Sequence, residues 1–134
     1  MIDHAGWAVA DIKKSRDFYV KALAPLGLSL VREGDGWAAF GHAPHTEFWI
    51  GTWGPPPGRV HIAFSAKSRG AVRGFHTAAL AAGGKDHGRP GIRAEYHPGY
   101  YGAFVIDPDG NNIEAVFHGE ADRSAGSVEI SFKA

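Results

Sequence analysis

The sequence predicts an α+β protein made of two βαβββ repeats, which form a curved mixed sheet around a central cup with the helices on the outer face. The first observation is an internal repeat, because an ungapped shift of 57 positions superposes residues of differing chemistry. The matched pairs are His4 with His61, Arg16 with Arg73, Phe18 with Phe75, Leu23 with Leu80, and Gly27 with Gly84. The second observation is that each copy begins with a strand pattern followed by a helix pattern.

The first unit covers about residues 1–54. Residues 4–9 alternate weakly and predict a strand, and Asp11 is suited to cap a helix from residue 12 to about residue 24. Short strands are expected at 28–33, 37–40 and 47–52, separated by turn-rich segments. Prolines and glycines then mark a linker at residues 55–58.

The second unit covers about residues 59–118. A strand is expected at 61–64, and a helix capped by Ser68 is expected from residue 69 to about residue 82. A loop containing residues 87–91 and a short strand around 92–96 should follow, before a hairpin that begins at Gly102. Residues 119–134 lie outside the repeat as a tail, and residues 128–132 fit an extra edge strand or a frayed end equally well.

The composition indicates one domain and excludes several classes of function. The chain has 134 residues, a net charge of zero and no cysteine, so a disulfide framework and a thiolate site are excluded. There is no basic patch for nucleic acid and no apolar run long enough for a membrane span. The N-terminal residues do not resemble a secretion signal, and we therefore expect a soluble cytoplasmic protein.

A carboxylate stands in the middle of the closing hairpin. The turn Asp107-Pro-Asp-Gly110 joins two apolar strands, and alternation in the second strand places Glu114 on the face opposite Ile113 and Ala115. A glutamate in such a strand is either part of a solvated face or a buried group that needs a partner, and a metal is one suitable partner.

The residues of this hairpin resemble a known family. Phe104-Val-Ile-Asp-Pro-Asp-Gly-Asn-Asn-Ile-Glu114 is similar to the closing signature of the vicinal oxygen chelate superfamily, which includes glyoxalases, bleomycin-resistance proteins and extradiol dioxygenases. The resemblance implies the fold of two βαβββ units over nearly the whole chain. It also implies that Glu114 is a metal ligand.

His4 and His61 are the other expected ligands, because they occupy equivalent repeat positions on the strand face that carries small residues. Two imidazoles and a carboxylate suit a divalent Zn, Ni, Fe or Mn ion. The alternative is that both histidines are partly buried and hydrogen-bonded to backbone.

The sequence departs from the family at the fourth ligand. Repeat alignment puts Trp49 or Ile50, and not an acid, opposite Glu114, and Glu47 could ligate only after a register slip of two residues. A site of three ligands and a site without metal both remain open.

Further candidates lie near the hairpin. Glu114 or His97 is expected to move a proton, and Tyr100, Tyr101, Arg93 and Trp49 are expected to bind the substrate. Plain turn chemistry and core packing are the competing explanations for these residues. His118 shares a strand face with Glu114, whereas the remaining histidines, His42, His45, His76 and His87, are expected at the surface.

Three functions are consistent with these features. The first is a metal-dependent lyase, isomerase or dioxygenase acting on a substrate with neighbouring oxygens. The second is a metal-free protein that sequesters a planar aromatic ligand, as in the bleomycin-resistance branch, and the third is a non-catalytic dimeric module. Exposed edge strands and the resemblance together predict a homodimer.

Overall fold

The computed structural model describes residues 2–121, and the strand considered for residues 128–132 lies outside them. Helix α1 (Ile12–Leu23) continues into the 3-10 helix η1 (Ala24–Leu26), and helix α2 (Arg69–Ala81) occupies the same place in the second half. Asp11 accepts a hydrogen bond from the Lys14 amide at 3.0 Å, and Ser68 accepts one from the Ala71 amide at 3.1 Å. Both expected helix caps are therefore confirmed.

Each half of the chain forms a four-stranded mixed sheet. The strands run in the order β1-β4-β3-β2 in the first sheet and β5-β8-β7-β6 in the second, with β1 parallel to β4 and β5 parallel to β8. Their bounds are β1 Ala5–Ala8, β2 Ser29–Gly34, β3 Trp37–Gly41, β4 Phe48–Gly51, β5 His61–Ser65, β6 Lys85–Ile92, β7 Tyr101–Ile106 and β8 Asn112–Phe117. The predicted α+β class and the two βαβββ halves are confirmed.

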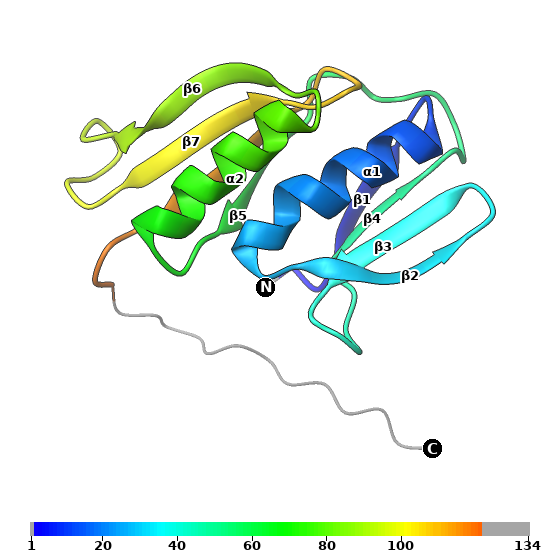
Figure 1. Ribbon diagram of the computed structural model, residues 1–134, viewed down its shortest axis with the longest axis horizontal. Helices are drawn as coiled ribbons and strands as arrows, with labels where there is room; N and C mark the ends of the chain where they lie inside the picture. The colour runs from blue at the N-terminus through cyan, green and yellow to red at the C-terminus, as the bar shows by residue number, and fades with distance from the viewer. Residues whose placement is uncertain (1, 122–134) are drawn as a thin grey trace.

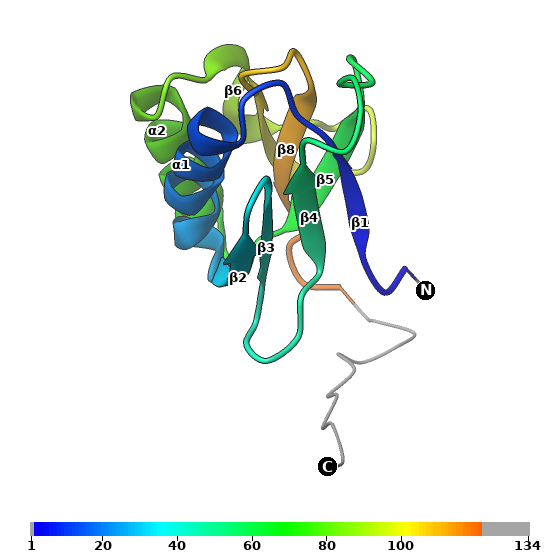
Figure 2. The ribbon, with the colours of Figure 1, turned by 90° about the vertical axis from the view of Figure 1, so that its right-hand side faces the viewer.

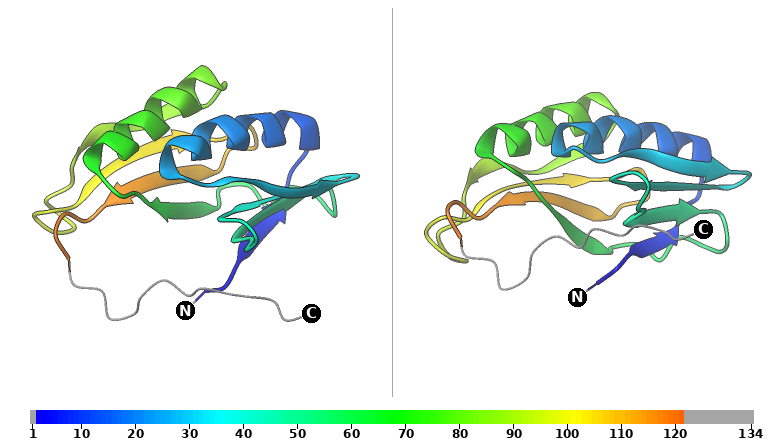
Figure 3. Two further views of the ribbon diagram at one scale, coloured as in Figure 1. Left: turned by 60° about the horizontal axis from the view of Figure 1, so that its bottom comes forward. Right: turned by 90° about the horizontal axis from the view of Figure 1, so that it is seen from below.

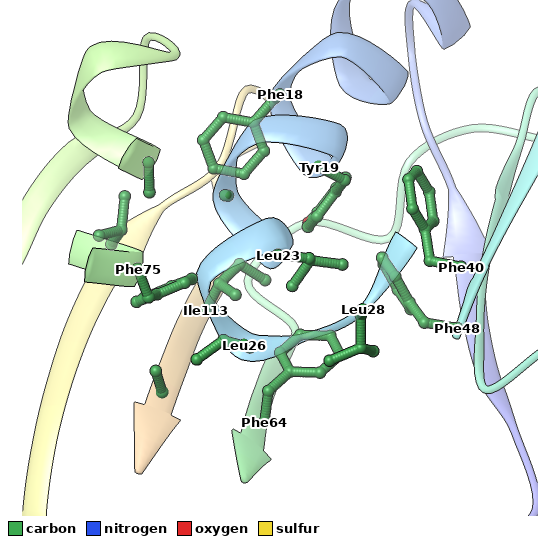
Figure 4. Packing of buried hydrophobic residues seen from close by; sticks show 14 of the residues in the cluster. Phe18, Tyr19, Leu23, Leu26, Leu28, Phe40, Phe48, Phe64, Phe75 and Ile113 are labelled. Carbon is green, nitrogen blue, oxygen red and sulfur yellow. The ribbon is translucent and has the colours of Figure 1, made fainter. Parts of the chain in front are cut away.

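The two helices lie side by side on one face of the sheets (Figure 1). Seen from the side and from below, the sheets turn their other face away from both helices (Figures 2 and 3). Aromatic side chains fill the layer between helices and sheets, where Phe18, Tyr19, Phe48 and Phe75 are at most 1% exposed (Figure 4). Burial of each such side chain stabilises the fold by roughly 1.5–3 kcal/mol. Trp7 and Val9 face this core, as the alternation of the first strand predicts.

The expected loop at residues 87–91 is wrong, because β6 runs from Lys85 to Ile92 and pairs with β7. The short strand expected around residues 92–96 is also wrong, since a turn follows β6 there. Pro90 and the neighbouring glycines conceal a strand in the sequence. Because β6 is the last strand of its sheet, a proline that lacks an amide proton is tolerated.

The turn of the closing hairpin ties the two halves together. The buried Asp107 carboxylate accepts hydrogen bonds from the Tyr19 hydroxyl at 2.5 Å and from the Asn111 amide at 2.8 Å. Asp109 accepts from the Ala10 amide at 3.1 Å, so the turn of the second half is fixed to the first. No helix among residues 2–121 is long and apolar enough to cross a membrane.

Candidate functional site

The face of each sheet that is turned away from the helices is here called the open face. One row of cross-strand neighbours crosses it in each half, and the two rows correspond under the repeat. The first row is Gly6, Trp49, Ala39 and Arg32, and the second is Ala63, Glu114, Phe104 and Gly88. Cross-strand neighbours in a row project from the same face, so each row brings side chains from several strands together.

Glu114 is the centre of the second row. It is 2% exposed although it carries a carboxylate, because side chains of β5 and of the segment before β7 cover it. The Tyr100 hydroxyl donates a hydrogen bond to Oε1, and Nε2 of His61 lies 3.3 Å from Oε2. The structure therefore brings Glu114, His61 and Tyr100 together.

The hydrogen bonds of His61 define the state of its ring. Nδ1 lies 2.9 Å from the Asn112 carbonyl oxygen, which can only accept, so Nδ1 carries a proton. In a neutral ring Nε2 then presents its lone pair to Glu114, and two acceptors face each other. A proton on the imidazole or on the carboxyl group, or a metal ion, would turn this contact into an attractive one. A backbone carbonyl on the far ring nitrogen is also the usual partner of a metal-binding histidine.

Phe104 provides a flat surface beside Glu114. Its ring lies 6.3 Å from the His61 ring at an interplanar angle of 25°, and Cζ of Arg93 lies 5.4 Å from its centroid. Arg93 thus reaches the row through the space left by Gly88, where a Cβ atom would lie 3.2 Å from its Nη2. Phe104 was not among the expected site residues. Its pairing with Glu114 across the hairpin was the available signal.

Tyr100 is held as a hydrogen-bond donor. Partial burial, the hydrogen bond to Glu114 and the charge of that carboxylate raise the pKa of the Tyr100 hydroxyl well above its usual value. The hydroxyl therefore stays protonated at neutral pH. Three rings surround the ring of Tyr100. Their centroids lie 4.9 Å (Tyr96), 5.5 Å (His97) and 5.2 Å (His118) from the centroid of the Tyr100 ring.

His97 and His118 form a hydrogen-bonded pair next to this tyrosine. The Gly99 amide donates to Nδ1 of His97 at 3.1 Å, so the proton of a neutral His97 lies on Nε2. That Nε2 lies 2.9 Å from Nδ1 of His118, which accepts the hydrogen bond. Gly99 is required at this turn, because a Cβ atom would lie 2.7 Å from the His118 carbonyl oxygen.

Three expected residues lie elsewhere. His4 belongs to the first half, where its Nδ1 lies 2.6 Å from Oδ1 of Asp3. Trp49 takes the place of Glu114 in the first row and stacks on Trp37 at 5.3 Å. Tyr101 begins β7 and packs on the helix side, where Cζ of Arg69 lies 5.1 Å from its ring centroid. The sheet separates Tyr101 from Glu114.

The donor set fits a metal ion only in part. Four tetrahedral ligands at ~2.1 Å from zinc lie roughly 3.4 Å from one another, a separation that the His61 and Glu114 atoms match. Within residues 2–121, however, no three His, Asp or Glu side chains gather closely enough to hold an ion. Glu47 does not contribute, because its Oε1 lies 3.0 Å from Nδ1 of His42.

A family model described as the Glyoxalase/Bleomycin resistance protein/Dioxygenase superfamily matches residues 1–115. No curated protein matches the chain.

Among solved structures, a glyoxalase/bleomycin resistance protein from Albidiferax ferrireducens T118 is 29% identical, with a TM-score of 0.73 over 85% of this chain and 95% of that one. A glyoxalase-related enzyme from Fulvimarina pelagi is 17% identical, with a TM-score of 0.68 over 87% of each chain. Glyoxalase I from Zea mays is 20% identical, with a TM-score of 0.64 over 89% of this chain and 45% of that longer one. The last two likenesses concern the fold alone.

Proposed function

The chain belongs to the glyoxalase/bleomycin resistance protein/dioxygenase superfamily, and on that premise we propose that it is an enzyme with its reacting centre at Glu114. The substrate is a small molecule with two neighbouring oxygens, and the reaction is that of a lyase, isomerase or dioxygenase. The observation that carries the proposal is a buried carboxylate whose Oε2 lies 3.3 Å from Nε2 of His61.

A divalent Zn, Ni, Fe or Mn ion is part of this proposal. His61 and Glu114 would hold it, and when bound it would supply a Lewis acid for a substrate oxygen. His4 remains the proposed third ligand, although in this chain it pairs with Asp3 in the other half. A second copy of the chain, or a different setting of the two halves, would have to bring such an imidazole to the centre.

The surrounding residues have their own roles in the proposal. Tyr100 orients the Glu114 carboxylate through its hydroxyl, and Glu114 takes the proton that the substrate loses. Arg93, with its guanidinium over Phe104, offers positive charge to a substrate oxyanion. His97 moves a proton, and the hydrogen bond from the Gly99 amide to its Nδ1 fixes its tautomer.

A metal-free ligand-binding protein is the second candidate. It is favoured by Trp49, which stands where a fourth ligand would be expected and gives the first row an aromatic wall. In that case the two halves would hold a planar ligand without transforming it. Measurements on variants of Glu114 separate the two candidates.

The experiment is a screen of diketones, catechols and thiohemiacetals with the protein loaded with each of the four metals. Glu114→Gln should abolish any turnover that is found, because the amide cannot accept the proton. Glu95→Gln serves as the matched control, since Glu95 is an exposed glutamate in the turn after β6. Turnover that survives in Glu114→Gln would contradict the proposal that Glu114 is the reacting centre.

A further inference from the structure

A pocket of about 230 Å³ opens on the first half of the molecule, apart from the Glu114 centre. Its walls include Trp49 of β4, Arg32 of β2 and His45 and Thr46 of the segment between β3 and β4. This volume is below the roughly 300–1,000 Å³ of pockets for drug-sized ligands, so the pocket has room for a molecule of about one ring.

The wall formed by Trp49 is flat and fixed. Trp37 stacks on it with ring centroids 5.3 Å apart and planes 23° from parallel. The backbone beneath is also tightly packed, because a Cβ atom on Gly6 would lie 2.6 Å from the Trp49 carbonyl oxygen. An indole held in this way offers a ready surface on which a planar ring can stack.

Arg32 supplies a charge that the residues described by the structure leave unpaired. It belongs to the same cross-strand row as Trp49, separated by Ala39, whose small side chain leaves the space between them open. Within residues 2–121, Arg32 has neither an ion pair nor a hydrogen bond from its side chain. The neighbouring Glu33 is engaged by Arg16, with Nε and Oε2 2.5 Å apart.

The carboxylate of the pocket, Asp3, already has two histidine partners. Oδ1 of Asp3 lies 2.6 Å from Nδ1 of His4, and Oδ2 lies 4.0 Å from Nε2 of His45. Among the described residues, the cation of this pocket without a partner is therefore the Arg32 guanidinium, a group that pairs with carboxylates through two parallel hydrogen bonds.

We propose that this pocket binds a single-ring aromatic carboxylate, with the ring on Trp49 and the carboxylate on Arg32. The proposal rests on the small-molecule function proposed above, but it requires neither a metal nor Glu114. The two halves would then have different functions, because the Glu114 row carries the proton-transfer groups and the Trp49 row recognises the ligand.

The test is a calorimetric titration of the full chain with benzoate. Phenol serves as a planar probe without the carboxylate, and cyclohexanecarboxylate serves as a carboxylate without the planar ring. Benzoate should bind most tightly of the three. Arg32→Gln should weaken benzoate binding by about tenfold or more, the scale of a charge-assisted hydrogen bond. Trp49→Leu should weaken it by roughly two- to tenfold, the scale of a lost aromatic stack. Arg59→Gln, at an exposed arginine between the linker and β5, should leave benzoate binding unchanged.

Glu114→Gln separates this proposal from the proposed enzyme. Benzoate affinity that is unchanged in Glu114→Gln supports a distinct pocket, whether or not the protein holds a metal. Affinity lost in Glu114→Gln and kept in Arg32→Gln would place the anion at the other centre and overturn the proposal. Absence of benzoate binding to the wild type would also overturn it, and thermal melting of each variant excludes unfolding as the cause of a loss.

Discussion

Trp49 and Glu114 occupy the same position in the two halves of the molecule. Trp49 pairs with Gly6 across a parallel strand pair, and Glu114 pairs with Ala63, which is the repeat equivalent of Gly6. One fold position thus holds an indole in the first half and a carboxylate in the second. The two open faces have the same backbone but different chemistry.

The turn that joins the halves is expected to be sensitive to the loss of one oxygen. In Asp107→Asn the amide cannot accept all four hydrogen bonds that Asp107 takes from Tyr19, Asp109 and Asn111, so a buried donor loses its partner. We expect a loss of about 2 kcal/mol in the free energy of unfolding in urea. Asp35→Asn, at an exposed turn position, should cost far less, and equal losses would contradict this account.

Close packing at the first row predicts a cost for a single methyl group. Gly6→Ala would place a Cβ atom 2.6 Å from the Trp49 carbonyl oxygen, so β1 and β4 would have to separate locally. We expect roughly 1–3 kcal/mol of destabilisation in urea unfolding. Gly54→Ala is the matched control, because nothing lies within 4 Å of a Cβ atom there. An unchanged free energy of unfolding in Gly6→Ala would show that β1 and β4 are packed less tightly than described.

Alkaline pH should destabilise the fold through Tyr19. Burial and the nearby Asp107 raise the pKa of the Tyr19 hydroxyl well above its usual value. Above pH ~10 the unfolded chain releases this proton, whereas the folded chain keeps it. The stabilisation that the protonated Tyr19 hydroxyl gives the folded state is therefore fully present below pH ~10 and is lost as the pH rises further. The slope is about 1.4 kcal/mol per pH unit for one proton.

The measurement is urea unfolding of the wild type and of Tyr19→Phe between pH 8 and 11. The variant should be less stable at pH 8, because it lacks the hydrogen bond to Asp107, but its stability should fall less steeply above pH 10. Tyr96→Phe, at a position 60% exposed, should follow the wild type. Parallel curves for wild type and Tyr19→Phe would contradict the assignment.

A homodimer remains a prediction. Strands β1 and β5 each end a sheet, so among the described residues one edge of each has no strand beside it. Such edges are commonly covered by another chain in a closed, two-fold arrangement. Light scattering at micromolar concentration should give the mass of two chains, and the mass of one chain would refute the prediction.

The repeat made most of the fold readable from the sequence, whereas β6 was hidden. Strands and helices with alternating or helical patterns were found because local pattern and burial agree in them. The β6 strand exists only through its pairing with β7, and Gly88 and Pro90 show no local preference for it.

The site was harder to predict than the fold. Glu114 stood out because a charged residue interrupts an apolar strand, but the roles of Phe104 and Arg93 depend on cross-strand register and on a side chain crossing above a glycine. Tyr101 was expected beside Tyr100, yet consecutive residues at the start of a strand face opposite sides of the sheet. Only the three-dimensional pairing separates them.

Metal content tests the central claim most directly. Protein purified without a histidine tag and dialysed in turn against Zn, Ni, Mn and Fe(II) should retain about one ion per chain with at least one of these metals. Glu114→Gln and His61→Gln should each lose that ion, while Glu95→Gln and His87→Gln, at exposed positions, should keep it. Full metal in Glu114→Gln and His61→Gln, or no metal in the wild type under any condition, would contradict the proposed centre.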